Sequence, residues 1–134
     1  MSFTLGKEER IKSRKSIENL FREAKAVRSP ALLALYHVPT INTEHRLQAM
    51  FTVSKKNFKR AHDRNAIKRY LRECYRLQKN ILNDLPGPLH LCFTFTGRQL
   101  PEYEYVYKKV GAALLEIDRI MKSTPKDETP SQEK

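Results

Sequence analysis

The sequence predicts an α+β protein in which one small β-sheet packs with helices in a sandwich. Two stretches alternate apolar and polar residues with the two-residue period of half-buried strands, and a third is a short apolar run bounded by prolines. Three other stretches place apolar residues every three or four positions, as amphipathic helices do. Their order along the chain is helix, strand, strand, helix, strand, helix, which fits a single sheet with helices packed on it.

The first predicted helix covers Ser13–Lys25, and Ser13 or Ser16 can cap its start. Its apolar positions fall at helical spacing: Ile11, Ile17, Leu20, Phe21 and Ala24. The helix is basic outside, because residues 1–28 carry eight Lys or Arg against four Glu.

Two strands are predicted after the first helix. The first predicted strand covers residues 31–38, between Pro30 and Pro39. Within this strand Tyr36 is expected to share a face with Leu32, Ala34 and Val38. Residues 40–45 are polar and predict a loop. Alternation over residues 47–53 predicts the second strand.

The basic helix follows directly and leads into the second half of the fold. Residues 80–88 contain Asn-Asp and Pro-Gly-Pro and predict a loop, and residues 89–96 alternate as a third strand. After a short connection, apolar residues at helical spacing predict a last helix over residues 102–121. We therefore expect a single domain over residues 1–121 and a disordered tail over residues 122–134, which has no apolar period.

Composition restricts the class of protein. A chain of 134 residues with 40% hydrophobic content can bury one core without a metal or disulfide. Cys74 and Cys92 both fall in apolar patterns and are expected to be buried free thiols, which fits a reducing compartment. No apolar run approaches 18 residues, and Met1–Lys12 lacks a signal-peptide core. These features predict a cytoplasmic protein without a membrane span.

The charge of the chain is concentrated in one stretch, Ser54–Gln78. Between Lys55 and Arg76 lie nine Lys or Arg against two acids, a local net charge of +7 in 22 residues, out of +11 for the whole chain. Apolar residues in the same stretch form one helical stripe: Ile67, Tyr70, Leu71 and Cys74. A helix anchored through an apolar stripe, with a cationic ridge beside it, is typical of proteins that bind a polyanion, and nucleic acid is the abundant one.

Lys59–Glu73, with sequence KRAHDRNAIKRYLRE, resembles the basic "RNR" helix of the protein subunit of bacterial ribonuclease P. The Val-Ser-Lys-Lys that precedes the helix and the pattern from Arg10 to Phe21 also resemble that family, so that the similarity covers roughly residues 10–119. Four positions depart from the family pattern: Ile17, Gln48, Met50 and Ala66.

The resemblance implies a function. Ribonuclease P removes the 5′ leader of precursor tRNA, and the RNA subunit carries out the reaction with Mg²⁺. The protein would bind ribonuclease P RNA and hold the single-stranded leader in a cleft between the first helix and the sheet. It would have no catalytic residue, metal site or cofactor of its own, and we expect a monomer when it is free. The family fold also implies a left-handed crossover of the βαβ unit around the basic helix.

Site residues follow from the charge pattern and the resemblance. The expected RNA-binding residues are Lys55, Lys56, Lys59, Arg60, Arg64, Asn65, Lys68, Arg69, Arg72 and Arg76. The expected leader cleft contains Arg10, Ile17, Phe21 and Tyr36. The two aromatic residues of the cleft can stack on bases, but core packing is an open alternative for each. His37, His45, His62 and His90 are scattered without metal-ligand spacing.

Two other functions are compatible with a basic helix. The first is an RNA-binding module without a part in any enzyme, for example a protein associated with the ribosome. The second is a helix-turn-helix DNA-binding protein, which requires a second helix joined to the basic one by three or four residues. The strand predicted immediately before Lys55 and the loop before the third strand argue against the helix-turn-helix.

Overall fold

A computed structural model of the chain describes residues 11, 14–39, 47–83, 85 and 88–123. The predicted loop at 40–45, Arg10 and Ser13 lie outside these residues. The elements are α1 (Arg14–Glu23), β1 (Lys25–Ser29), β2 (Leu32–His37), β3 (Leu47–Val53), α2 (Ala61–Gln78), the 3-10 helix η2 (Lys79–Leu82), β4 (Leu89–Phe95) and α3 (Tyr103–Ser123).

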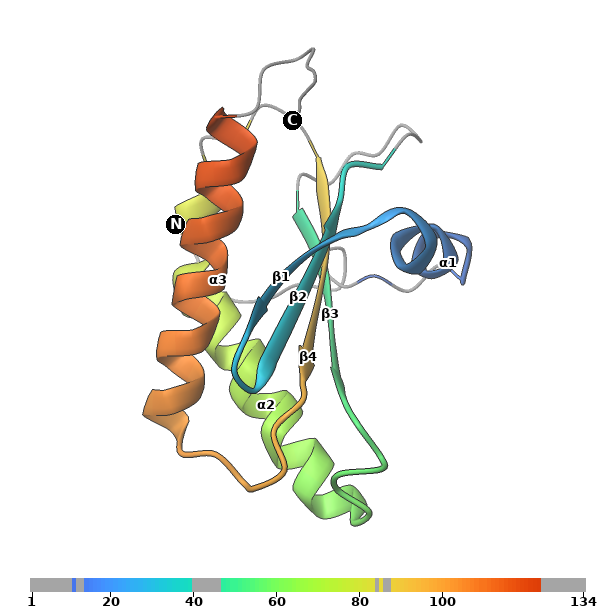
Figure 1. The fold of residues 1–134 in the computed structure, drawn as a ribbon, viewed down its shortest axis with the longest axis vertical. Helices are drawn as coiled ribbons and strands as arrows, with labels where there is room; N and C mark the ends of the chain where they lie inside the picture. Colours follow the sequence, from blue (N-terminus) through green and yellow to red (C-terminus); the bar gives the residue numbers. More distant parts are fainter. Residues whose placement is uncertain (1–10, 12–13, 40–46, 84, 86–87, 124–134) are drawn as a thin grey trace.

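One four-stranded sheet, in the order β1-β2-β4-β3, separates the helices into two layers. Figure 1 shows α2 and α3 on one face of the sheet and α1 on the other. Strands β3 and β4 are parallel neighbours joined through α2, whereas β1 with β2, and β2 with β4, are antiparallel. The predicted α+β sandwich is therefore confirmed. It contains the β3–α2–β4 unit, for which the family resemblance implies a left-handed crossover.

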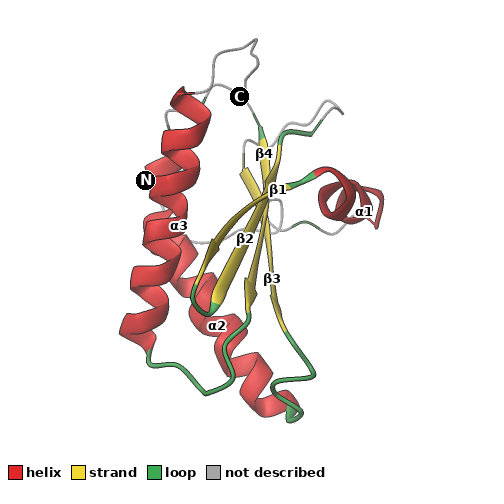
Figure 2. Cartoon of the chain, viewed as in Figure 1, coloured by secondary structure: helices red, strands yellow, loops and turns green. Residues whose placement is uncertain are grey.

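Strand β1 is not predicted by the sequence pattern. Its five residues include two bases, and none of the five is buried. The sequence therefore places its first residue, Lys25, at the end of the first helix, which stops at Glu23 in the structure. Figure 2 shows β1 paired along β2 at the edge of the sheet. Pro30 and Ala31 form the two-residue turn between them, and Ala31 has a φ of 70°, which is rare without glycine.

Two further boundaries differ from prediction. The stretch predicted as a loop after α2 begins with the 3-10 turn η2, because Leu82 is fully buried and holds the chain against α3. Helix α3 continues to Ser123, so the predicted tail begins at least two residues too early. The rest of that tail lies outside the described residues.

The main core lies between the sheet and the pair α2 and α3. It buries Tyr75, Phe93, Leu71 and Ile67 completely. The rings of Phe51, Tyr75 and Phe93 lie 5.6–5.9 Å apart between centroids, in stacked and edge-on pairs. A second, smaller cluster joins α1 to the opposite face of the sheet through Ile11, Leu20 and Cys92. The basic helix is thus fixed by the larger of the two cores.

Candidate nucleic-acid interface

Helix α2 is held in place by one buried stripe. Ile67, Leu71, Cys74 and Tyr75 are fully buried against the sheet and α3. Tyr70, predicted to belong to this stripe, is only partly buried and packs edge-on against Tyr103 of α3, with ring centroids 5.6 Å apart. Because the apolar stripe is fully used by the core, the remaining surface of the helix is fixed toward solvent.

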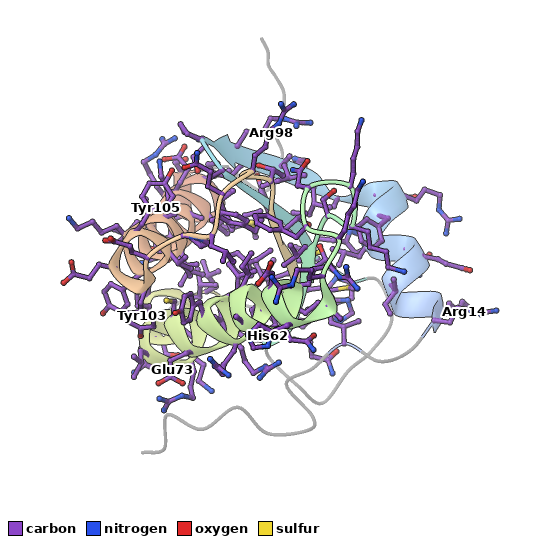
Figure 3. The ribbon with its side chains drawn as sticks, turned by 90° about the horizontal axis from the view of Figure 1, so that it is seen from below. Arg14, His62, Glu73, Arg98, Tyr103 and Tyr105 are labelled. Atoms are coloured by element: carbon purple, nitrogen blue, oxygen red, sulfur yellow. The ribbon has the colours of Figure 1, made fainter. Side chains whose placement is uncertain are left out.

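The predicted RNA-binding residues gather along this solvent side. Lys55, Lys56, Lys59, Arg60, Asn65 and Arg69 are exposed, and Arg64, Lys68, Arg72 and Arg76 are partly buried. Arg60 precedes the first helical residue, Ala61, as its N-cap, so the cationic ridge begins in the loop and not in the helix. Figure 3 shows the nitrogen ends of side chains along the outer edge of α2, next to the labelled His62 and Glu73.

Among the residues that the structure describes, side-chain partners within the protein are seen for two of the ten predicted residues, Arg64 and Arg76. Arg64 donates hydrogen bonds from Nη1 to the carbonyl oxygens of Phe58 and Lys59, at 2.8 and 2.9 Å. Arg76 forms a two-bonded ion pair with Glu73, and these hydrogen bonds lower the pKa of the Glu73 carboxyl. Arg64 therefore also shapes the loop before α2, and the charge of Arg76 is locally compensated by the acid.

The loop before α2 is anchored by two residues that the charge pattern did not single out. The side-chain amide of Asn57 donates to the carbonyl oxygens of Thr96 and Gly97, both at 3.2 Å. Phe58 is 6% exposed and packs on Phe95, with ring centroids 6.0 Å apart. In the sequence, Asn57 and Phe58 differ from the lysines around them, and this difference could have indicated that they anchor the loop. They hold the lysines of this loop in a fixed position.

The surface beside α1 contains part of the predicted leader cleft. Ile17 is partly buried and packs on the cluster of Leu20 and Cys92. Phe21 is 53% exposed. It is therefore not packed in the core, which was the alternative to a place on the cleft surface. Arg10 lies outside the described residues.

Tyr36 lies on the opposite face of the sheet from α1. Its predicted place in the leader cleft is therefore wrong. It is 6% exposed and belongs to the main core under α2 and α3. Its neighbour Leu35 points to the α1 side and packs on the small cluster. The strand pattern did not decide between these faces, because residues 32–35 are apolar on both. The structure assigns the face through the pairing of β2 with β4.

Hydroxyl groups lie on the α1 side of the sheet. Thr52 and Thr94, paired across β3 and β4, bring their hydroxyl oxygens to 2.7 Å of one another. The thiol of Cys92 lies 3.7 Å from the Thr94 hydroxyl, and burial raises its pKa. Both cysteines are buried free thiols as predicted, and burial also raises the pKa of Cys74 to about 11. The α1 side therefore offers polar hydrogen-bonding groups as well as apolar surface.

The described residues contain no group of three or more His, Cys, Asp or Glu placed to hold a metal ion. Among the helices that the structure describes, none combines the length and the apolar character needed to cross a membrane. Helix α2 is joined to sheet strands on both sides, through the loop after β3 and through η2 before β4. This connectivity excludes the helix-turn-helix arrangement for α2.

A sheet that anchors one helix and leaves its outer side strongly basic defines an α+β protein of the nucleic-acid-binding class. Comparison with known proteins makes the class specific. A family model described as Ribonuclease P matches residues 5–117. The ribonuclease P protein component of Porphyromonas gingivalis strain W83 is 33% identical over 123 residues, which cover 87% of this chain and 88% of that protein. The chain belongs to the ribonuclease P protein family.

Other relatives and solved structures agree with this assignment. The ribonuclease P protein component of Chlorobaculum tepidum is 38% identical over 74 residues, covering 53% of this chain and 48% of that protein. The ribonuclease P protein from Thermotoga maritima superposes with a TM-score of 0.60 at 23% identity, covering 83% of this chain and 96% of that one. The ribonuclease P protein from Staphylococcus aureus superposes with a TM-score of 0.56 at 18% identity, covering 84% of this chain and 94% of that one. The two structures support the fold.

Proposed function

We propose that this chain is the protein subunit of a ribonuclease P holoenzyme in the cytoplasm. The observation that carries the proposal is the basic side of α2, fixed by a buried stripe in a chain of this family. In this role the side chains of the loop before α2 and of its outer side bind the ribonuclease P RNA. Each phosphate contact releases counterions, so that binding weakens steeply with salt.

The second part of the proposal concerns the substrate. The 5′ leader of precursor tRNA would lie along the α1 side of the sheet, where Phe21 of α1 is exposed. An aromatic ring stacks on bases of any sequence, which suits a leader that varies among tRNAs. The Thr52 and Thr94 hydroxyls on this side can donate to phosphate or sugar oxygens. Tyr36 has no part in this surface.

Bond cleavage is assigned to the RNA subunit and its Mg²⁺ ions, and the protein contributes binding and positioning. No residue of the chain is proposed to act in catalysis, and no cofactor is proposed to bind to the protein by itself. The free protein is proposed to be a monomer. The alternative of an RNA-binding module outside any enzyme is not favoured, because the family match covers most of the chain.

The test is reconstitution with a bacterial ribonuclease P RNA on precursor tRNA at low magnesium. Adding the protein should allow cleavage at the mature 5′ end under conditions where the RNA by itself is slow. A double variant, Lys68→Ala with Arg69→Ala, should weaken binding to the RNA and lower the slope of affinity against salt by about two, one for each cation removed from a phosphate. Lys108→Ala, an exposed lysine on α3, is the matched control. Absence of any stimulation by the wild-type protein would refute the proposal.

A further inference from the structure

A pocket lies where the end of the sheet meets the start of α3, away from the outer side of α2. Its volume is about 490 Å³, within the roughly 300–1,000 Å³ that is usual for small-molecule sites. Its apolar lining comes from three separate parts of the chain: Ala31 in the β1–β2 turn, Phe95 at the end of β4, and Leu100 and Pro101 in the loop before α3. Neither the RNA-binding helix nor the leader surface accounts for it.

Tyr105, in the first turn of α3, forms an aromatic wall of this pocket. Its side chain is 41% exposed, and Leu100 on the facing loop is 57% exposed. The ammonium group of Lys109, one turn further along α3, lies 5.4 Å from the centroid of the Tyr105 ring. A partly exposed aromatic ring beside apolar lining residues is a surface on which a flat ring can stack.

Polar groups are available in the same lining. Glu102 and Gln99 line the pocket, and their side chains can bond the edge of a heterocyclic ring, where a carboxylate accepts from amino groups and an amide both accepts and donates. Arg98, which also lines the pocket, is exposed and can meet a phosphate. Stacking surface, edge-bonding groups and a cation together match the chemistry of a nucleotide.

The loop before α2 is hydrogen-bonded to one residue of the pocket lining. Asn57 bonds the carbonyl of Gly97, at 3.2 Å, and Gly97 lines the pocket. Lys55 and Lys56, both exposed, immediately precede Asn57. Figure 3 looks at this end of the molecule, with Arg98 on the loop, Tyr105 on α3 and His62 in the first turn of α2 labelled. A nucleic acid bound at the loop is therefore close to the pocket.

We propose that this pocket binds an unpaired base of the ribonuclease P RNA. The inference rests on the proposed function, and it adds a base-stacking site to a surface that otherwise contacts phosphates. The catalytic RNA is favoured over the tRNA leader because the pocket adjoins the loop before α2 and lies on the α3 side of the sheet. The leader surface is on the other side. Unstacked bases in loops and bulges are what proteins usually capture in structured RNA.

The carboxylate of Glu102 gives the proposed site a preference among bases. A carboxylate accepts hydrogen bonds, so that adenine, cytosine and guanine, which donate from an exocyclic amino group, should bind better than uracil, which donates only from its N3–H. Glu102→Gln should reduce that preference, because the amide both donates and accepts.

The experiment measures binding of the full chain to a bacterial ribonuclease P RNA at several salt concentrations. Tyr105→Ala should weaken binding about 5- to 100-fold, the range for removal of one base–aromatic stack, while the salt slope stays unchanged because every phosphate remains bound by the same cations. Tyr105→Phe keeps the ring and should bind like wild type. Leu115→Ala removes a side chain that is 58% exposed on the same helix and serves as the matched control.

A photo-crosslinker in place of Leu100 identifies the occupant. The proposal expects crosslinks to an unpaired nucleotide of the ribonuclease P RNA within the complex. Crosslinks to precursor tRNA or to another protein, or a Tyr105→Ala variant that binds as tightly as wild type, would overturn it while leaving the proposed function intact. Failure of the wild-type chain to bind the RNA at all would instead refute the proposed function, and the pocket assignment with it.

Discussion

The two faces of the sheet differ in how they are covered. On the side of α2 and α3 the sheet contributes Leu91, Phe93 and Phe95 to a core in which these side chains are almost fully buried. On the other side, α1, a helix of ten residues, is the described element that covers the sheet, and the buried cluster there contains Ile11, Leu20 and Cys92. Figure 1 shows the longer helices α2 and α3 on one side of the sheet and the shorter α1 on the other.

The chemistry of the two faces differs as well. The α2 and α3 side packs three aromatic rings, Phe51, Tyr75 and Phe93, against each other. The α1 side carries threonine hydroxyls and, at its other end, His37 and His90, which pair across β2 and β4. One face therefore holds the larger buried core, and the other carries polar groups and an exposed Phe21. Substitutions on each face test the comparison.

The largest effect on stability is expected from the core on the side of α2 and α3. Phe93→Ala removes a fully buried ring and should lower the free energy of unfolding by about 3–5 kcal/mol. This decrease is a large part of the stability of a domain of this size. Urea unfolding followed by circular dichroism measures it. A decrease below about 1 kcal/mol would contradict the complete burial of Phe93 in the main core.

Truncation on the α1 side should cost less. Leu20 is fully buried under α1, but the helix is short and the surrounding cluster is small, so the site can collapse. Leu20→Ala should destabilise by about 2 kcal/mol, near the low end of the range for such truncations. Hydrogen exchange should show faster opening in α1 than in α2. Equal protection of both helices would contradict the asymmetry.

The histidine pair on the α1 side predicts a dependence of stability on pH. His90 is 5% exposed, and its ring nitrogens have no hydrogen-bond partner among the described residues. Burial, with a smaller contribution from His37, lowers the pKa of His90 below its ordinary 6.5. The unfolded chain therefore binds the proton at a higher pH than the folded chain does, and stability falls as pH drops below about 6.5.

Unfolding midpoints in urea at pH 7.5, 6.5 and 5.5 measure this effect. His90→Leu removes the titrating group and should flatten the dependence over that range. Equal pH dependence of wild type and His90→Leu would show that another group is responsible.

The smallest effect on stability is expected at the exposed aromatic residue. Phe21 is 53% exposed, so Phe21→Ala should change the free energy of unfolding by no more than about 0.5 kcal/mol. Under the proposed function the same variant should lower the preference of the holoenzyme for precursor over mature tRNA at least about fivefold. A variant that keeps the preference would remove Phe21 from the leader surface.

Most of the fold is accessible from periodicity alone. The positions of α2, β3, β4 and α3 follow from alternation or helical spacing of apolar residues in the sequence, even though β4 is buried on both faces. Strand β1 escapes prediction because a short edge strand has no buried face of its own to set a period. The prediction for Tyr36 is wrong for the complementary reason, because both faces of β2 are apolar and either can be the core side.

The sequence by itself determined the basic helix, its apolar stripe and the family resemblance, because charge and spacing along one helix are local properties. Only the tertiary structure decided which cations are engaged within the protein and which loop residues hold the others. It also brought Ala31, Phe95 and Tyr105 to one pocket. These residues are far apart in the chain, and only strand pairing and helix packing bring them together, which no local pattern encodes.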